Sequence, residues 1–147
     1  SPVNSPANLV PVITETAFGL REQMTVFGTD YDTRDGSCVR DYIHVMDLAR
    51  AHTLSLRYLM EGKSETSVEI FNVGTGTGVT VLEAIEAFES STGKKLNYAL
   101  GPRRPGDVIA VFADNKKARR DLGWNPSRSI RDIMKTAWEW EIQRRKS

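Results

Sequence analysis

Short apolar, β-branched segments alternate with amphipathic helical segments along this chain, and that alternation restricts its fold more than any other feature. Apolar side chains recur every three or four residues in the helical segments. The predicted helices cover residues 8–18, 47–60 and 80–92, a short segment from Asp114 to Gly123, and a last segment that begins at Ser127 or Ser129. The predicted strands cover residues 24–28, 39–45, 68–73, 96–100 and 108–112. Strands interleaved with helices place the chain in the α/β class.

The composition indicates one globular domain. Of the 147 residues, 39% are apolar and 27% charged, and no apolar run approaches the roughly 20 residues of a membrane span. The formal net charge of +1 gives no reason to expect nucleic-acid binding. A single cysteine, Cys38, is expected to be buried and fits a reducing compartment. We therefore expect a cytoplasmic protein without a membrane or nucleic-acid partner.

Two arginine sites are the strongest functional candidates. Arg40 lies in an apolar strand-like segment, where a guanidinium needs an anionic partner. That partner is either a neighbouring carboxylate, Asp41 or Asp47, or a bound ligand. Arg103 and Arg104 lie in a Pro-Gly turn much later in the chain. Two guanidinium groups that close on one anion suit a diphosphate.

The residues around these arginines suggest how a nucleotide could be held. Asp107 follows Arg104 by three positions, and its carboxylate can accept hydrogen bonds from a sugar diol. The alternative is simple ion pairing of Asp107 with Arg103. The segment Met24–Phe27 can offer backbone N–H and C=O groups and a ring face to a flat base, or it can be a core strand. Both alternatives stay open from the residues alone.

The remaining motifs do not indicate catalysis or metal binding. The glycine run Gly74–Gly78 lies between a strand and a helix, but Val79 replaces the third glycine of the dinucleotide-binding fingerprint, so we expect a tight turn. His44 and His52 are not at a metal-ligand spacing; His44 is expected to be a buried structural residue and His52 a helix-surface residue. The sequence therefore assigns no catalytic residue and no metal ligand.

Taken together and in order, five segments resemble the C-terminal half of the UDP-galactose 4-epimerases, which are extended short-chain dehydrogenases/reductases. The segments are Asn8–Pro11, Val26–Tyr31, Val39–Ala49, Phe71–Gly74 and Arg103–Asp107. The resemblance extends from about Asn8 to the helix that contains Trp138 and Trp140. It implies that residues 1–147 form the C-terminal UDP-sugar-binding domain, an α/β unit of small sheets and flanking helices with the Rossmann core largely missing. The segment from about 47 to 74 would pack on the missing NAD-binding domain.

The resemblance also assigns a set of residues to the UDP-sugar site. Grouped by the part of the ligand they would contact, they are Asn8, Leu9, Arg40 and Arg104 at the diphosphate, Met24, Thr25 and Phe27 at the uracil, Asp107 at the ribose hydroxyls, and Tyr42, Val81 and Val111 at the nucleotide or sugar. Val111 stands where some family members carry a bulky aromatic residue beside the sugar's 2-position. A smaller side chain there implies room for UDP-N-acetylhexosamines.

In that family a bound NAD takes hydride from C4 of the sugar, and the hydride returns to the other face of a 4-keto intermediate. The implied function is therefore the substrate-binding half of an enzyme that interconverts UDP-galactose and UDP-glucose. The family's catalytic Tyr-x-x-x-Lys pair and Gly-x-x-Gly-x-x-Gly loop are absent from the sequence, so NAD would be bound mainly elsewhere and the fragment alone would be inactive. The full-length protein would be a homodimer. The alternatives are another NAD-dependent nucleotide-sugar epimerase or dehydratase, and a stand-alone non-catalytic nucleotide-binding module.

Overall fold

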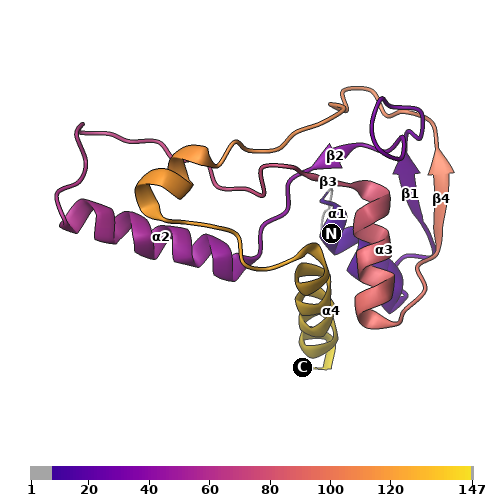
Figure 1. Cartoon of the computed structure of the whole chain (residues 1–147). Coiled ribbons are helices and arrows are strands. Elements are labelled where there is room, and N and C mark those ends of the chain that lie inside the picture. The colour runs from indigo at the N-terminus through magenta and orange to yellow at the C-terminus, as the bar shows by residue number, and fades with distance from the viewer. Residues whose placement is uncertain (1–7, 147) are drawn as a thin grey trace, which may run out of the picture.

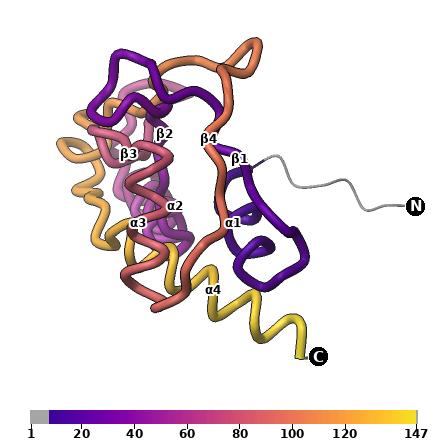
Figure 2. The backbone as a smooth tube through the Cα atoms, turned by 90° about the vertical axis from the view of Figure 1, so that its right-hand side faces the viewer, coloured from indigo at the N-terminus to yellow at the C-terminus, as the bar shows by residue number. Residues whose placement is uncertain are grey.

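The computed structural model describes residues 8–146 as helices around two small sheets (Figure 1). In chain order the elements are α1 (Leu9–Phe18), β1 (Met24–Phe27), β2 (Val39–Arg40), α2 (Val45–Met60), β3 (Val79–Thr80), α3 (Val81–Thr92), β4 (Tyr98–Gly101), the short π-helix η1 (Ala118–Leu122) and α4 (Ile130–Lys146). Strands β1 and β4 pair in parallel and lie side by side in Figure 2, whereas β2 and β3 pair antiparallel. The α/β class is confirmed.

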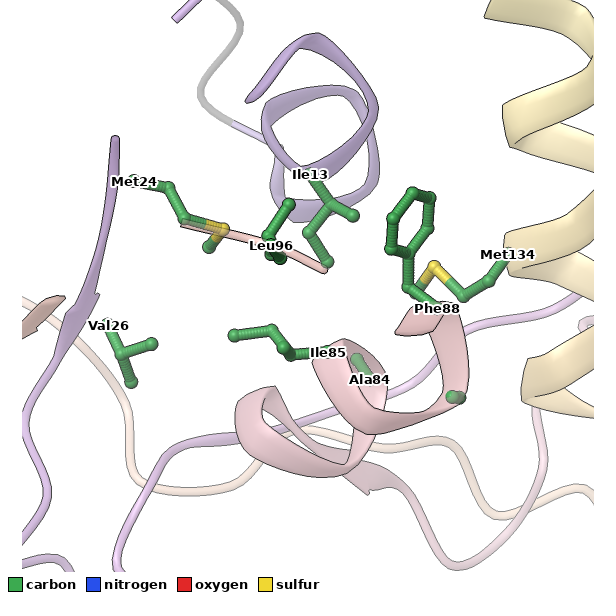
Figure 3. Packing of buried hydrophobic residues seen from close by; sticks show 9 residues of the cluster. Ile13, Met24, Val26, Ala84, Ile85, Phe88, Leu96 and Met134 are labelled. Atoms are coloured by element: carbon green, nitrogen blue, oxygen red, sulfur yellow. The ribbon is translucent and has the colours of Figure 1, made fainter. Parts of the chain in front are cut away.

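The main hydrophobic core lies where α1, α3 and α4 meet the β1–β4 sheet (Figure 3). Local signals set the helix ends: Asn8 and Gly19 flank α1, and Thr80 and Glu83 form a capping box at the start of α3. The helices and strands then contribute one buried cluster, made of Ile13, Met24, Val26, Ala84, Ile85, Ala87, Phe88, Leu96 and Met134. This core fixes β1 and the first turn of α1, which border the site described below.

A second core forms around Trp124, between α2 and η1. The indole ring is fully buried, and its Nε1 donates a hydrogen bond to the backbone oxygen of Asp47 at 2.8 Å. The Asp47 carboxylate accepts three further hydrogen bonds, from the Ser127 hydroxyl and from the backbone N–H groups of Ser127 and Arg128. In Figure 1, α2 and η1 lie together at the left, away from α1, α3 and α4. Trp124 thus ties α2 to the rest of the chain.

Three predicted strands were wrong in part or in whole. Residues 68–73 form no strand, and the side chains of Val68 and Ile70 are each 75% exposed. Residues 108–112 contribute only an isolated bridge between Ala110 and Val39. The predicted strand 39–45 is limited to Val39–Arg40. A strand forms only where another strand supplies backbone partners, which periodicity within one segment does not reveal.

The start of α2 also differs from the prediction. The helix was predicted to cover residues 47–60, but it begins at Val45. His44 is the N-cap, and its Nδ1 accepts a hydrogen bond from the Met46 N–H at 3.1 Å. Asp47 is buried within the first turn, and its carboxylate accepts hydrogen bonds from Ser127 and Arg128, just before α4. The prediction that His44 is a buried structural residue is confirmed, because it is 7% exposed and its Nε2 is 3.1 Å from the Thr136 hydroxyl. Within residues 8–146, no helix is long and apolar enough to cross a membrane.

Candidate functional site

A cavity of about 750 Å³ lies beside α1, β1, β2 and the turn that carries the two consecutive arginines. All the predicted site residues except Val111 line it: Asn8, Leu9, Met24, Thr25, Phe27, Arg40, Tyr42, Val81, Arg104 and Asp107. Val111 does not line it; its side chain is 52% exposed and its backbone N–H donates to the Val39 oxygen. Tertiary structure therefore brings together residues that lie in five separate parts of the sequence.

Arg40 enters the cavity from β2 and is held by backbone oxygens. Its Nη1 donates to the oxygen of Val39 at 2.8 Å and to that of Val108 at 2.7 Å. Its Nη2 is 3.8 Å from Oδ1 of Asp107. The alternative that Arg40 pairs with Asp41 or Asp47 was wrong, because both of those carboxylates accept hydrogen bonds from other segments. Arg40 therefore faces Asp107 across the cavity.

Arg104, in the turn at residues 103–106, also contacts the Asp107 carboxylate. Its Nη2 donates to Oδ1 of Asp107 at 2.7 Å, and its guanidinium carbon lies 5.3 Å from the centre of the Phe27 ring. The hydrogen bond to Asp107 raises the pKa of Arg104. The alternative pairing of Asp107 with Arg103 was wrong. Two guanidinium groups share the Asp107 carboxylate, so this part of the cavity has one more positive than negative charge and can attract an anion.

Strand β1 leaves one backbone edge unpaired beside the cavity. The N–H groups of Met24 and Gly28 donate to β4-side oxygens, at 3.1 and 3.0 Å. Because successive residues of a strand direct their backbone groups to alternate sides, Thr25 and Phe27 present theirs on the other edge. Both of these residues line the cavity. Met24 borders the cavity too, but its side chain is 3% exposed and belongs to the main core.

Asp41 is a cavity residue that the sequence did not reveal. Its carboxylate accepts hydrogen bonds from the Thr75 N–H, the Thr75 hydroxyl and the Ala113 N–H, at 2.9, 2.7 and 2.9 Å. A side chain at Gly74 would clash, since a Cβ there would lie 2.0 Å from Asp41 Oδ2. The predicted tight turn at Gly74–Gly78 thus packs directly on the residue between Arg40 and Tyr42. The position of Asp41 between the predicted site residues Arg40 and Tyr42 was the sequence signal that could have identified it.

The Tyr42 hydroxyl is buried and has no hydrogen-bond partner among residues 8–146. Burial raises the pKa of Tyr42 to about 12, against a smaller opposing effect from the Arg40 charge. An unfolded tyrosine ionises near pH 10, so between pH 10 and 12 the folded chain holds a proton that the unfolded chain has lost. We expect the free energy of unfolding to fall over this range, by at most about 1.4 kcal/mol per pH unit.

Urea denaturation at several pH values, compared with Tyr42→Phe, checks this expectation. The variant has no hydroxyl to ionise and should show a shallower decline above pH 10. Equal slopes for the two proteins would contradict it.

Among residues 8–146 no group of His, Cys, Asp and Glu side chains could hold a metal ion.

The comparisons with known proteins agree with this geometry. The sequence profile of a family described as GDP-mannose 4,6 dehydratase matches residues 3–137. The chain belongs to this family of extended short-chain dehydrogenases/reductases. Among curated proteins it is similar to the UDP-glucose 4-epimerase of Bacillus subtilis, with 44% identity over 140 residues. That alignment includes 95% of this chain but 40% of the relative, so the chain spans well under half the length of that enzyme.

Solved structures of the same family superpose closely on the chain. A UDP-glucose-4-epimerase from Stenotrophomonas maltophila, with bound NAD and formylated UDP-arabinopyranose, has a TM-score of 0.92 at 42% identity over 99% of this chain and 43% of that chain. The UDP-Glc/GlcNAc 4-epimerase from Campylobacter jejuni has a TM-score of 0.85 at 39% identity over 97% of this chain and 43% of that chain. The chain therefore has the fold of the C-terminal part of extended short-chain dehydrogenase/reductase epimerases.

Proposed function

We propose that this chain is the UDP-sugar-binding half of a NAD-dependent UDP-glucose 4-epimerase, which interconverts UDP-galactose and UDP-glucose. The observation that carries the proposal is the cavity in which Arg40 and Arg104 converge beside the free edge of β1. Curated relatives and solved structures named as UDP-glucose 4-epimerases support the choice of reaction. No other nucleotide-sugar enzyme is favoured by a feature of the cavity.

The diphosphate would lie between the two arginines and the start of α1. Arg40 and Arg104 supply guanidinium donors suited to phosphate oxygens. Asn8 and Leu9 line the cavity at the N-terminus of α1, and the Asn8 side chain makes no capping hydrogen bond. In that first turn Pro11 has no N–H and the Val12 N–H donates to the Asn8 oxygen, so the N–H groups of Leu9 and Val10 are the ones that would face an anion. The helix dipole favours negative charge there.

The uridine would lie along β1. Its uracil ring presents one N–H donor between two carbonyl acceptors, which the alternating C=O and N–H groups of Thr25 and Phe27 can match. Asp107 would accept hydrogen bonds from the ribose hydroxyls once the diphosphate draws on the two arginines. Val81 and the Tyr42 ring would form walls of the site. Firm binding at the nucleotide leaves the sugar free to present either face to the cofactor.

NAD would supply the hydride chemistry in the complete enzyme. The residues of this chain do not form its main binding site, because the polar groups of the glycine turn are engaged internally. Thr75 Oγ1 accepts a hydrogen bond from the Gly78 N–H, and Asn115 donates to the Gly74 oxygen. No Tyr-x-x-x-Lys pair is present to move the proton of the sugar 4-hydroxyl. This chain therefore binds and orients the substrate, and we propose that it is inactive by itself.

The segment from about 47 to 74 would pack on the NAD-binding domain. It carries several large apolar side chains that are exposed in this chain: Leu48, Leu56, Leu59, Met60, Val68 and Ile70. An exposed apolar face of this kind is typical of a protein interface, which argues against a stand-alone nucleotide-binding module. The complete enzyme would be a homodimer, as the resemblance implies, and we expect it to be cytoplasmic from its composition.

Calorimetry with UDP on this chain tests the proposal. We expect UDP to bind with a dissociation constant of about 1 mM or lower, and ADP, which has the same diphosphate but a purine base, to bind more weakly. Equal affinity for both would contradict uracil recognition by β1. Absence of UDP binding to this chain would contradict a site preformed without the NAD-binding domain.

The proposed substrates include UDP-N-acetylhexosamines. Val111 has a small side chain and lies outside the cavity lining, so it does not narrow the sugar end of the site. The similar Campylobacter jejuni protein is named a UDP-Glc/GlcNAc 4-epimerase. We expect the complete enzyme to turn over UDP-N-acetylglucosamine. No turnover of the N-acetylated sugar by the unmodified enzyme would contradict this.

A further inference from the structure

Arg103 and Arg104 are consecutive, but they face opposite sides of the turn that carries them. Arg104 lines the cavity, whereas Arg103 does not. We infer that Arg103 is a positioning residue, which fixes the turn against the loop after β1 so that Arg104 stays directed at the diphosphate site. This inference rests on the proposed function of the cavity and adds to it a residue outside the cavity.

Arg103 makes three contacts with that loop. Its Nε donates to Oδ1 of Asp30 and its Nη2 to the backbone oxygen of Asp30, both at 2.8 Å. Its guanidinium carbon lies 4.3 Å from the centre of the Tyr31 ring. A planar guanidinium can make a forked hydrogen bond and stack on an aromatic face at the same time, which a lysine ammonium cannot do. The three contacts together fix both the position and the plane of the guanidinium.

The loop that receives Arg103 is itself well anchored. Tyr31 is 7% exposed, and its ring packs so closely on Gly28 that a Cβ there would lie 2.2 Å from Tyr31 Cε2. The Gly28 N–H donates to the oxygen of Gly101, at the end of β4, and the Tyr31 N–H donates to the oxygen of Gly36. The ends of β1 and β4 thus form one rigid support directly ahead of the turn.

The turn has little other support. Residues 103–106 are exposed, and within the turn the structure shows one backbone hydrogen bond, from the Asp107 N–H to the Arg104 oxygen at 3.2 Å. The remaining side-chain contacts are those of Arg104 with Asp107 and Phe27 and of Arg40 with Asp107, and all of them involve groups that a nucleotide would engage. When the two arginines exchange Asp107 for phosphate oxygens, the contacts of Arg103 with Asp30 and Tyr31 still hold the turn. Binding would then require no reordering of the turn backbone.

A double-mutant cycle tests the inference on this chain. We expect Arg103→Ala to weaken UDP binding about 3- to 10-fold, and to have less than about a 2-fold effect when Arg104 is already alanine, because Arg103 acts through Arg104. Arg103→Lys, which keeps the charge beside Asp30 and Tyr31, should recover part of the affinity. Arg120→Ala, which removes an exposed arginine paired only with its neighbour Asp121, is the control for net charge.

Hydrogen exchange of the ligand-free chain gives an independent measurement. In Arg103→Ala the Asp107 amide should exchange faster, with no change at the buried face of α3. Equal effects of Arg103→Ala in the two backgrounds, or unchanged exchange at Asp107, would overturn the inference. If the unmodified chain fails to bind UDP, the proposed function is contradicted for this chain, and hydrogen exchange alone then decides whether Arg103 positions the turn.

Discussion

Replacement of Arg40 or Arg104 by alanine is expected to weaken UDP binding to this chain by about 30- to 150-fold, because each variant loses a charge-assisted pair of hydrogen bonds of about 2–3 kcal/mol. Each change also leaves Asp107, whose side chain is 11% exposed, beside one guanidinium in place of two. The negative charge of this carboxylate then opposes the diphosphate more strongly. Calorimetric titration of each variant with UDP measures the loss.

Three controls make this result specific. Arg120→Ala removes the same charge outside the cavity and should bind UDP as the unmodified chain does. Arg40→Lys and Arg104→Lys keep the charge but lose the forked geometry, and should fall between the alanine variants and the unmodified chain. Titrations in increasing salt should weaken binding less in the alanine variants, since fewer charges take part. Unchanged UDP affinity in both alanine variants would contradict the placement of the diphosphate between Arg40 and Arg104.

The largest loss of stability is expected from Trp124→Ala. The side chain is fully buried between α2 and η1, so its truncation should lower the free energy of unfolding by about 3–5 kcal/mol. The truncation also removes the hydrogen bond from Nε1 to the Asp47 oxygen. Urea denaturation followed by circular dichroism measures this change, without any assumption about ligands.

Trp124→Phe is the matched variant for this prediction. It keeps an aromatic ring and loses the Nε1 donor, so we expect a smaller decrease, of about 1–2 kcal/mol for the unsatisfied Asp47 oxygen together with the smaller ring. A decrease below about 1 kcal/mol in Trp124→Ala would show that α2 and η1 are not held by a packed core. Since α2 carries much of the exposed apolar face, we expect Trp124→Ala also to impair association with the NAD-binding domain.

The helices were predictable because their signals are local. Gly19 ends α1 in the left-handed conformation, and Thr80 with Glu83 forms a capping box at the start of α3; the partners of both caps lie within about one turn. The strands were predicted less well. The apolar run at residues 68–73 has the composition of a buried strand, but no described strand lies beside it. A strand depends on backbone partners from elsewhere in the protein, and composition does not provide them.

The sequence predicted most of the residues that line the cavity, but not which arginine pairs with which carboxylate. The sequence indicated that Arg40 needs an anion, because a guanidinium in an apolar context is unfavourable without one, and that Arg104 could supply a second guanidinium to the same anion. It did not indicate that Asp107 would form ion pairs with both Arg40 and Arg104, or that Asp30 would pair with Arg103. It also gave no sign that Asp41 would be fully engaged by Thr75 and Ala113. Asp41 and Asp47 were the wrong candidates for Arg40, and Asp107 was the wrong candidate for Arg103.

The sequence by itself determined the α/β class, the apolar faces of the helices, the capping box of α3, and the need of Arg40 for a negative charge. Each of these follows from interactions within a few residues or from the free energy of burying a charge. Only the tertiary structure decided which carboxylate lies between the arginines, which strand edge borders the cavity, and which arginine of the turn faces inward. These depend on distances between segments such as Arg40 and Val108, which are 68 positions apart in the chain and in direct contact in the fold.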